Sequence, residues 1–495
     1  MAAWLPSRAM PPHPNNLLTM TTSTAPRAGL IEKVGYGFGD MASSMFWKIF
    51  SYYLPFFYSN VFGLSLVDAG VLLLVTRIWD AVSDPMMGVL SDRTNTRWGK
   101  YRPYLLWFAA PFSICGILLF TAPDWGYSAK LLWAYVTYIL MMTVYTGINV
   151  PYGAMLGVVT ADPNEKTVFS SFRMFFAYGG SFIALAAWEP LCAWFNAAYS
   201  LSPASSWQAA MIVIATACFI LFLLCFRLTR ERLKTVSAVS IGSDFRSLLS
   251  NKPWWLLIGA ALCFNLFNTA RGATVAYFFV DIIGRDAEIV VWGLQFAFYS
   301  GLFLSIGEVA NMVGVALCVP IAARLGKKTT FMAVNASLVV LSVGFFFLPA
   351  TSTTGFLLML LFQIVISVLT GIMSPLVWSM YADVSDYAEL KYHTASTGLI
   401  FSSSSMAQKF GGAIGGAGVL WLLDACGYVA RAETQIEQYV PQPDSALTCL
   451  WMLMSFIPAA VALISMIIVS FYPLTTARVN EIVSQLNAVR AAGKN

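Results

Sequence analysis

Long apolar stretches, separated by short polar connections, recur along the whole chain. A helix needs roughly 20 mostly apolar residues to cross a membrane, and in lipid its backbone hydrogen bonds must be satisfied within the segment. The pattern therefore predicts twelve transmembrane helices in two sets. The first set lies near residues 36–62, 66–91, 103–122, 129–157, 169–196 and 208–228, and the second near 254–283, 289–322, 329–349, 355–382, 397–424 and 446–473.

Short motifs repeat at matching places in the two sets. Arg97-Trp98-Gly99-Lys100 follows the second helix and Arg324-Leu325-Gly326-Lys327 the eighth, while Ala161-Asp162 and Ala382-Asp383 end the fourth and the tenth. The repetition predicts an internal duplication, as in transporters with a site between two repeats. We expect an all-α membrane protein of two pseudo-symmetric six-helix bundles. The expected boundaries are a disordered tail over 1–30, bundles over 31–228 and 254–475, a cytoplasmic linker over 229–253 and a cytoplasmic tail over 476–495.

Lysine and arginine concentrate in the connections after the second, sixth and eighth predicted helices. These basic residues include Arg93, Arg97, Lys100, Arg102, Arg227, Arg230, Arg232, Lys234, Arg324, Lys327 and Lys328. Basic connections stay on the cytoplasmic side, so both termini are expected in the cytoplasm. The first thirty residues show no cleavable signal peptide, and are interpreted as a tail or as sequence upstream of a start at Met20.

The composition agrees with a membrane protein and excludes several other classes. The chain is 58% hydrophobic and 11% charged, whereas soluble domains are about 25% charged. Its net charge of +5 comes without a long basic run, so nothing points to nucleic-acid binding. Two histidines and eight scattered cysteines form no metal motif. Cys426 and Cys449 flank an expected external loop, and whether they pair stays open.

The second predicted helix carries charges that a membrane span tolerates only with a partner, a watery cavity or a function. Spacings of three and four residues put Arg77, Asp80 and Asp84 on one helical face. Two carboxylates one turn apart repel each other, and Na⁺ or a proton between them relieves that repulsion. Ser83 adds a hydroxyl on a nearby face. The alternative is a structural network in which Arg77 neutralises one acid, although one arginine leaves the second acid without a partner.

Further polar residues within the predicted spans are candidates for contacts with a sugar. Asp40 and Lys48 lie about two turns apart on the first helix and either bind substrate or pair with each other. Arg271, Arg173, Asn149 and Lys409 also lie in predicted spans. Sugar hydroxyls need such donors and acceptors, but polar contacts between helices explain each residue equally well. Glu189 and Glu308 are assigned no role.

These motifs resemble the glycoside–pentoside–hexuronide:cation symporter family, a branch of the major facilitator superfamily that includes the melibiose carrier. The resemblance covers nearly the whole chain. It rests on Tyr36-Gly37-Phe38-Gly39-Asp40, Arg77-Ile78-Trp79-Asp80 through Asp84-Pro85, Arg97-Trp98-Gly99-Lys100, Tyr145-Thr146 with Pro151, Ala382-Asp383, Asp386-Tyr387 and Lys409. It implies the major facilitator fold and a multi-pass protein of the bacterial inner membrane.

The resemblance also implies roles for individual residues. The expected cation ligands are Asp80, Asp84, Ser83 and Thr146. The expected substrate contacts are Asp40, Ser44, Tyr145, Asn149, Arg173, Arg271, Trp378, Ser404 and Lys409. Arg77, Arg97, Lys100, Asp383 and Asp386 are expected to have structural or gating roles, the loops at 92–102 and 383–391 acting as cytoplasmic latches unless their charges only set topology.

Departures from the melibiose carrier concentrate among the sugar-contacting positions. Ser43-Ser44 replaces its Lys-Asp pair, Asn149 an aspartate, Gly153 a tryptophan, and Ser404-Ser405 a Gln-Thr pair. We therefore do not expect melibiose as the substrate. Loss of acids beside Arg173, Arg271 and Lys409 suggests a positive potential that would suit an anionic sugar.

The resulting hypothesis is a secondary active transporter rather than an enzyme. It would import a glycoside, oligosaccharide or hexuronide by alternating access, coupled to Na⁺ or H⁺ and without another cofactor. Its expected partners are the sugar, the cation and membrane lipid, with no nucleic acid, and the chain is expected to be a monomer. The alternative is a carrier of the same fold for a lipid or other amphipathic solute.

Overall fold

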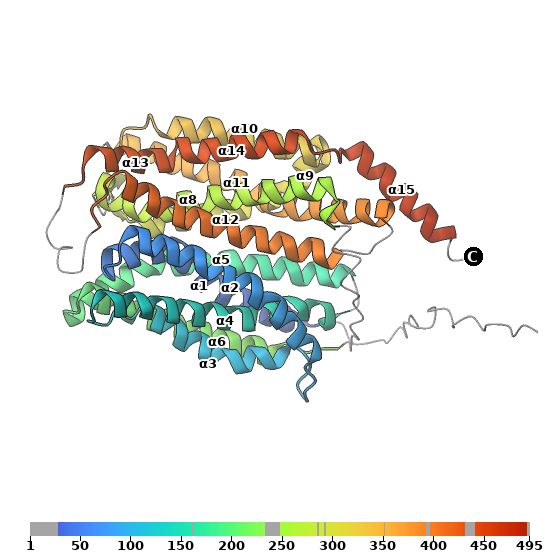
Figure 1. Cartoon of the computed structure of the whole chain (residues 1–495), viewed down its shortest axis with the longest axis horizontal. Coiled ribbons are helices and arrows are strands. Elements are labelled where there is room, and N and C mark those ends of the chain that lie inside the picture. Colours follow the sequence, from blue (N-terminus) through green and yellow to red (C-terminus); the bar gives the residue numbers. More distant parts are fainter. Residues whose placement is uncertain are drawn as a thin grey trace, which may run out of the picture.

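The computed structural model describes residues 28–160, 163–232, 248–284, 287–291, 294–350, 352–392, 397–430 and 441–492. Its long helices lie roughly side by side in two groups, α1 to α6 in one and α8 to α14 in the other (Figure 1). We call the end of the bundle near Arg93–Arg102 and α15 the tail end. The opposite end, near Phe57–Ser65 and the β1–β2 hairpin, is called the hairpin end.

The first half contains six long helices. They are α1 Leu30–Phe56 (continued by the π-helical turn η1 Phe57–Val61), α2 Leu66–Arg93, α3 Arg102–Leu119, α4 Tyr127–Val159, α5 Pro163–Tyr199 and α6 Pro203–Leu228. Polar caps define where several of these helices begin. Ser65 precedes α2, and its hydroxyl accepts the N–H of Asp68 at 3.1 Å. This bond satisfies one of the backbone donors that the first turn of a helix leaves unpaired.

The second half repeats this plan with two changes. Its elements are α8 Lys252–Phe278 with η2 Phe279–Ile283, β1 Ala287–Val291, β2 Leu294–Phe298, α9 Ser300–Leu325, α10 Lys327–Phe345, α11 Thr353–Tyr392, α12 Thr397–Ala425, α13 Asp444–Met454 and α14 Phe456–Ser470. The prediction of a helix from residue 289 is wrong, because Ala287–Val291 and Leu294–Phe298 are antiparallel strands in which Ala287 pairs with Phe298. Valines and aromatic residues in this segment favour strands. The last span is interrupted at Ser455, between α13 and α14.

Helix contacts within one half recur in the other. α1 packs on α5 and α6, α2 on α4, and α3 on α4 and α6; in the second half α8 packs on α12 and α14, α9 on α11, and α10 on α11 and α14. The halves meet through α2 with α12, α5 with α9, and α1 with α8. If α2 corresponds to α9 and α5 to α12, the α2–α12 interface of one half becomes the α9–α5 interface of the other. The contacts therefore agree with an internal two-fold relation between the halves.

Several helices have the length and surface of membrane spans. Nine helices in the described part of the chain are long and apolar enough to cross a membrane. Large apolar side chains stay exposed on their outer surfaces, among them Ile212 and Ile220 of α6, where lipid would cover them. α1, α2 and α12 fall outside that set of nine, so the count of twelve remains a prediction. The fold is an all-α, multi-pass membrane fold apart from the hairpin.

The predicted boundary segments have different outcomes. Residues 1–27 and 233–247, which hold most of the expected tail and linker, lie outside the described residues, as does 431–440 between Cys426 and Cys449. Both cysteines are free thiols. The expected C-terminal tail forms a helix, α15 Thr476–Ala492, which packs on α11 (Figure 1).

Candidate functional site

The charged face of α2 points into the protein. The guanidinium of Arg77 donates to Asp80 Oδ2 over 3.0 Å, and both side chains are buried. Arg77 also lies over the Trp47 ring of α1, 5.0 Å from its centre. Asp80 Oδ1 is buried and has no hydrogen-bond partner among the described residues. One oxygen of this carboxylate is thus available to a further cation or donor.

Asp84 has partners from two other helices. Its Oδ1 accepts a hydrogen bond from Thr146 of α4 at 2.8 Å, and its Oδ2 forms an ion pair with Lys409 of α12. The inference that one arginine leaves the second acid without a partner is therefore wrong, because the other half supplies a lysine. Each acid faces one base, and the Asp84–Lys409 pair joins the two halves.

Three other residues with expected roles make different contacts. The first, Ser83, is an expected cation ligand, and Asn149 and Tyr145 are expected substrate contacts. Ser83 donates weakly to the Asp80 carbonyl of its own helix at 3.4 Å, and Asn149 donates to the Tyr145 carbonyl at 3.1 Å. The Tyr145 ring packs against Trp47 with 5.2 Å between ring centres. In this structure Ser83 and Asn149 thus satisfy backbone groups rather than the two carboxylates.

A further ion pair joins α1 and α5. Arg173 Nε donates to Asp40 Oδ2 at 2.8 Å, and the guanidinium lies over the Tyr152 ring. The premise that Arg173 and Lys409 lack acidic neighbours is wrong, since Asp40 and Asp84 neutralise them. Sequence reasoning looked for replacements at the family's positions and did not see that Asp40 reaches Arg173.

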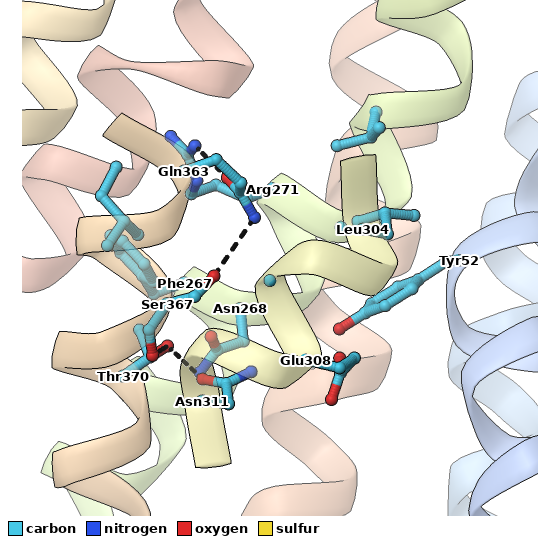
Figure 2. Close-up of a pocket in the computed structure, with 14 residues that line it drawn as sticks. Tyr52, Phe267, Asn268, Arg271, Leu304, Glu308, Asn311, Gln363, Ser367 and Thr370 are labelled. Carbon is cyan, nitrogen blue, oxygen red and sulfur yellow. Dashed lines mark hydrogen bonds between the residues drawn. The ribbon is translucent and has the colours of Figure 1, made fainter. Parts of the chain in front are cut away.

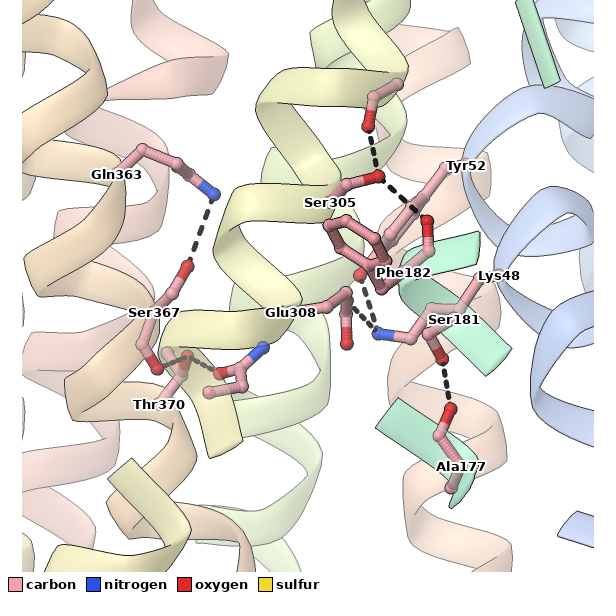
Figure 3. Close-up of polar contacts among 12 residues, drawn as sticks. Lys48, Tyr52, Ala177, Ser181, Phe182, Ser305, Glu308, Gln363, Ser367 and Thr370 are labelled. Carbon is pink, nitrogen blue, oxygen red and sulfur yellow. Dashed lines mark hydrogen bonds and ion pairs between the residues drawn. The ribbon is translucent and has the colours of Figure 1, made fainter. Parts of the chain in front are cut away.

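Lys48 does not pair with Asp40. It donates to Glu308 of α9 at 2.6 Å and to the Tyr52 hydroxyl at 3.2 Å. Figure 3 shows Lys48 reaching from α1 toward Glu308. Nearby, Ser305 of α9 donates to the Phe182 carbonyl of α5 at 3.1 Å. Among the described residues, the Lys48–Glu308 pair is the second ionic contact between the halves.

Arg271 lies in a polar pocket of the second half (Figure 2). The pocket is partly open, and about 430 Å³ of space, open solvent included, lies between α8, α9 and α11, with Tyr52 of α1 on one side. The guanidinium donates to the Met454 carbonyl and, at 2.9 Å, to Gln363 Oε1. Among the described residues Arg271 has no acidic partner.

The remaining expected substrate contacts are only partly described. Ser44 is half-buried on α1. Trp378 is half-buried on α11, with its ring 6.1 Å from that of Tyr381. The side chain of Ser404 lies outside the described residues.

The expected latch in the first half is held by Glu231. Its carboxylate accepts the backbone N–H groups of Lys100, Tyr101 and Arg102, each at 2.7 Å, where α3 begins. Carboxylates are stabilised at helix N-termini by such donors and by the helix dipole. Gly99 takes a φ of 116° beside it, and Arg97 stacks on Trp98 at 4.4 Å.

The corresponding contact in the second half is an ion pair. Lys327 Nζ lies 2.7 Å from both oxygens of Asp383, and Asp386 is half-buried one turn further along α11. These contacts of Glu231 and Lys327 each join elements of the same half. Their gating role remains a prediction.

Sequence reasoning gave Glu308 no role, and it missed Gln363 and Glu231. Glu308 is 3% exposed within an otherwise apolar span, and the cost of burying an ionisable group was a sufficient signal. Gln363 lies in a similar apolar run, where a single amide is weak evidence. Glu231 gave no signal, because charges are ordinary in a polar connection.

The arrangement favours binding of a polar solute over covalent chemistry. Among the described residues no group of three or more His, Cys, Asp or Glu side chains is placed to hold a metal. Ion pairs, amides and hydroxyls instead gather where the halves meet.

Comparisons with known proteins agree with this geometry. Residues 35–476 match the sequence profile of the family described as "MFS/sugar transport protein". The chain is 36% identical over 464 residues to the "Putative glycoside/cation symporter YagG" of Escherichia coli K12, covering 93% of this chain and 95% of that protein. It is 34% identical to the isoprimeverose transporter of Lactiplantibacillus pentosus, covering 81% of each chain.

Solved structures are similar in fold at low sequence identity. A bacterial homologue of the human peptide transporters PepT1 and PepT2 superposes with a TM-score of 0.65 at 12% identity. The match covers 92% of this chain and 99% of that chain. At this identity the likeness shows the fold alone.

Proposed function

The chain belongs to the MFS/sugar transport protein family, and from this premise we propose that it imports a neutral glycoside or oligosaccharide by symport with Na⁺ or H⁺. The two halves would rock about a central site and expose it to each side of the bacterial inner membrane in turn. The relative named as a glycoside/cation symporter supports the cation coupling, and the isoprimeverose transporter supports a glycoside substrate.

One observation carries the proposal: the Asp84–Lys409 ion pair spans the two halves beside a buried Asp80 oxygen that no described residue satisfies. In this state the lysine ammonium occupies a place against Asp84 that a coupling cation would take in another state. Entry of the cation frees Lys409, and movement of α12 then reshapes the cavity for sugar. Coupling of about 1–3 kcal/mol is typical of such linked sites and is reciprocal.

A neutral substrate is favoured by the charge balance. Arg173, Lys409, Arg77 and Lys48 each have a carboxylate partner. An anionic sugar would have to displace a carboxylate from one of these four bases, while Arg271 already donates to the Met454 carbonyl and to Gln363. Amides and hydroxyls suit a neutral sugar, and this polar lining disfavours the alternative of a lipid or amphipathic solute.

The test is uptake of sugars into proteoliposomes that carry the purified protein. Xylobiose, isoprimeverose, melibiose, lactose and phenyl glucuronide are supplied with an inward Na⁺ gradient, an inward H⁺ gradient or none. We expect one or more neutral sugars to accumulate against their gradient with one of the ions. Accumulation of the glucuronide alone would contradict the neutral class, and accumulation of none would contradict the function.

Two variants test the ion site. Asp80→Asn and Asp84→Asn should abolish uphill accumulation and leave exchange of sugar down its own gradient measurable. The matched control is Asp68→Asn, an acid on the same helix whose carboxylate bonds the Ser65 hydroxyl at 2.8 Å. Uphill accumulation by both site variants at the wild-type level would remove the assignment.

Limited proteolysis tests the expected orientation. The basic connections favour a cytoplasmic location for both termini. Cleavage at an engineered protease site in the linker 229–253, only after spheroplasts are opened, would agree with this orientation.

A further inference from the structure

The pocket around Arg271 is lined mainly by the second half and is distinct from the charged face of α2. Asn268 and Arg271 come from α8, Glu308 and Asn311 from α9, and Gln363 from α11 (Figure 2). Its remaining wall is Tyr52 of α1, which lies so close to α8 that a Cβ on Gly272 would be 2.2 Å from its ring. The pocket therefore spans the interface between the halves.

Several of its polar groups have bonding capacity left. Glu308 is 3% exposed, and its Oε2 has no partner among the described residues, while its Oε1 accepts from Lys48. In Figure 3 Glu308 lies between α9 and Lys48. Asn311 Oδ1 accepts from Thr370 at 2.9 Å, and within the described chain its Nδ2 has no hydrogen bond. Burying the Glu308 oxygen unpaired is costly, and this points to a ligand that satisfies it and reaches the half-buried Asn311 amide beside it.

The position of the pocket follows from the repeated motifs. Asp84 precedes Arg97 of the first motif by 13 residues, and Asn311 precedes Arg324 of the second by the same 13. Asp84 bonds a threonine of α4 at 2.8 Å, and Asn311 bonds a threonine of α11 at 2.9 Å. The pocket is thus the counterpart, in the second half, of the site proposed for the coupling cation.

The side chains at the two places select different ligands. The first half has two carboxylates, Asp80 and Asp84, whereas the aligned positions hold Gly307 and Asn311. A hard cation prefers carboxylate oxygens, so this exchange weakens a cation site. A free anion is repelled by the Glu308 carboxylate, and Arg271 already donates to Gln363 and Met454. Neutral hydroxyls both donate and accept, and they match a carboxylate oxygen beside an amide N–H.

We propose that this pocket, through Glu308 and Asn311, binds one ring of a neutral glycoside with two or more sugar units. The proposal rests on the sugar-transport function above and adds the part of the site that selects for length. The other ring would lie toward the Asp40–Arg173 pair.

The spacing along α1 supports two rings. Asp40, Ser44, Lys48 and Tyr52 follow each other at intervals of four residues, which places them along one side of the helix. All four are half-buried. Their twelve-residue span corresponds to about 18 Å of helix rise, which is longer than one sugar ring requires. In this row, Asp40 lies toward the tail end and pairs with Arg173, whereas Lys48 pairs with Glu308 of the pocket.

The experiment compares transport kinetics in proteoliposomes for Asn311→Leu and wild type. Xylobiose is compared with methyl xyloside, and lactose with methyl galactoside. We expect wild type to prefer the disaccharide, and Asn311→Leu to raise its KM about tenfold, the effect of one lost hydrogen-bonding group. The KM of the methyl glycoside and the ion concentration for half-maximal uptake should stay within about twofold.

Two further variants keep the result interpretable. Asn335→Leu is the control, because Asn335 is a buried amide on α10 outside the pocket and bonds its own helix at 2.9 Å. Folding of Asn311→Leu is protected, since Thr370 keeps its bond to the Ser367 carbonyl at 3.0 Å. Asn311→Asp removes the amide donor and should also raise the disaccharide KM, with the ion-to-sugar ratio unchanged.

Each contrary outcome identifies what fails. An unchanged disaccharide KM in Asn311→Leu, or an equal rise with Asn335→Leu, overturns the pocket assignment and leaves symport standing if wild-type uptake is ion-driven. A second ion carried per sugar by Asn311→Asp would overturn it in favour of a cation site. Absence of ion-driven uptake of every sugar in wild type overturns both proposals.

Discussion

Lys48 of α1 and Glu308 of α9 form an ion pair across the interface between the two halves, with 2.6 Å between Nζ and Oε1. Their positions are 260 residues apart in the chain. Together with Asp84–Lys409, the pair gives the described part of the interface two ionic contacts, one between α1 and α9 and one between α2 and α12. The halves are therefore connected by charges that another ligand or ion can replace.

The Lys48–Glu308 pair should contribute strongly to stability. Glu308→Ala leaves a largely buried lysine without its acid, and this is expected to lower the free energy of unfolding by about 3–5 kcal/mol. Denaturant unfolding in detergent micelles measures it. The control is Glu481→Ala, which breaks an exposed pair with Arg478 and should cost about 0–1 kcal/mol. Lys48→Ala and the double variant complete the cycle. If the double variant loses the sum of the two single effects, the two residues are not coupled.

Lys409 should compete with the coupling cation. Lys409→Met leaves Asp80 and Asp84 facing only Arg77, so the site becomes net negative and attracts a cation more strongly. We expect the ion concentration for half-maximal uptake to fall about tenfold, equivalent to about 1.4 kcal/mol, and initial-rate uptake across an ion series measures it. Lys391→Met, at an exposed lysine bonded to Tyr387 at 2.8 Å, should change nothing. A higher ion requirement in Lys409→Met would show that the lysine supports ion binding.

The glycines of the two repeated motifs should be intolerant of a side chain. Gly99 and Gly326 have φ values of 116° and 82°, and added Cβ atoms would lie 2.5 Å from the Glu231 carboxyl carbon and from the Thr476 hydroxyl. Alanine at either position is expected to cost about 1–3 kcal/mol. Gly88→Ala, where a Cβ meets nothing within 4 Å inside α2, should instead stabilise by about 0.5–1 kcal/mol. Thermal unfolding in detergent compares the three, and equal melting temperatures would contradict the strain.

Acid should weaken the start of α5. The Thr160 hydroxyl, at 2.6 Å, and then the Ala28 N–H, at 2.9 Å, lower the pKa of Glu165 from its ordinary 4.5. Glu165 lies before the candidate span Val168–Tyr199. A lowered pKa in the folded state gives stability that is present above pH 4.5 and is lost as the pH falls through the folded value. Melting temperatures measured below pH 5 should decline less in Glu165→Gln than in wild type, and parallel declines would exclude this contribution.

The sequence by itself determined the solvent and the plan of the molecule. Apolar runs of membrane length, few charges and repeated motifs are local patterns, and a bilayer allows such runs to be helical. The same local reasoning placed Arg77, Asp80 and Asp84 on one face of α2, because helical periodicity is fixed by backbone geometry. It failed at Ala287–Val291 and Leu294–Phe298, because apolar segments this short do not separate helix from strand.

Only the tertiary structure decided which charges meet. Lys409 lies 325 positions from Asp84, and no periodic pattern links the two helices that bring them together. The pairing of Asp40 with Arg173, and the choice of Glu308 rather than Asp40 by Lys48, likewise follow from helix packing. Coulomb interactions between buried groups depend on distances of a few ångströms, and those distances are set by how whole helices pack rather than by neighbours in the chain.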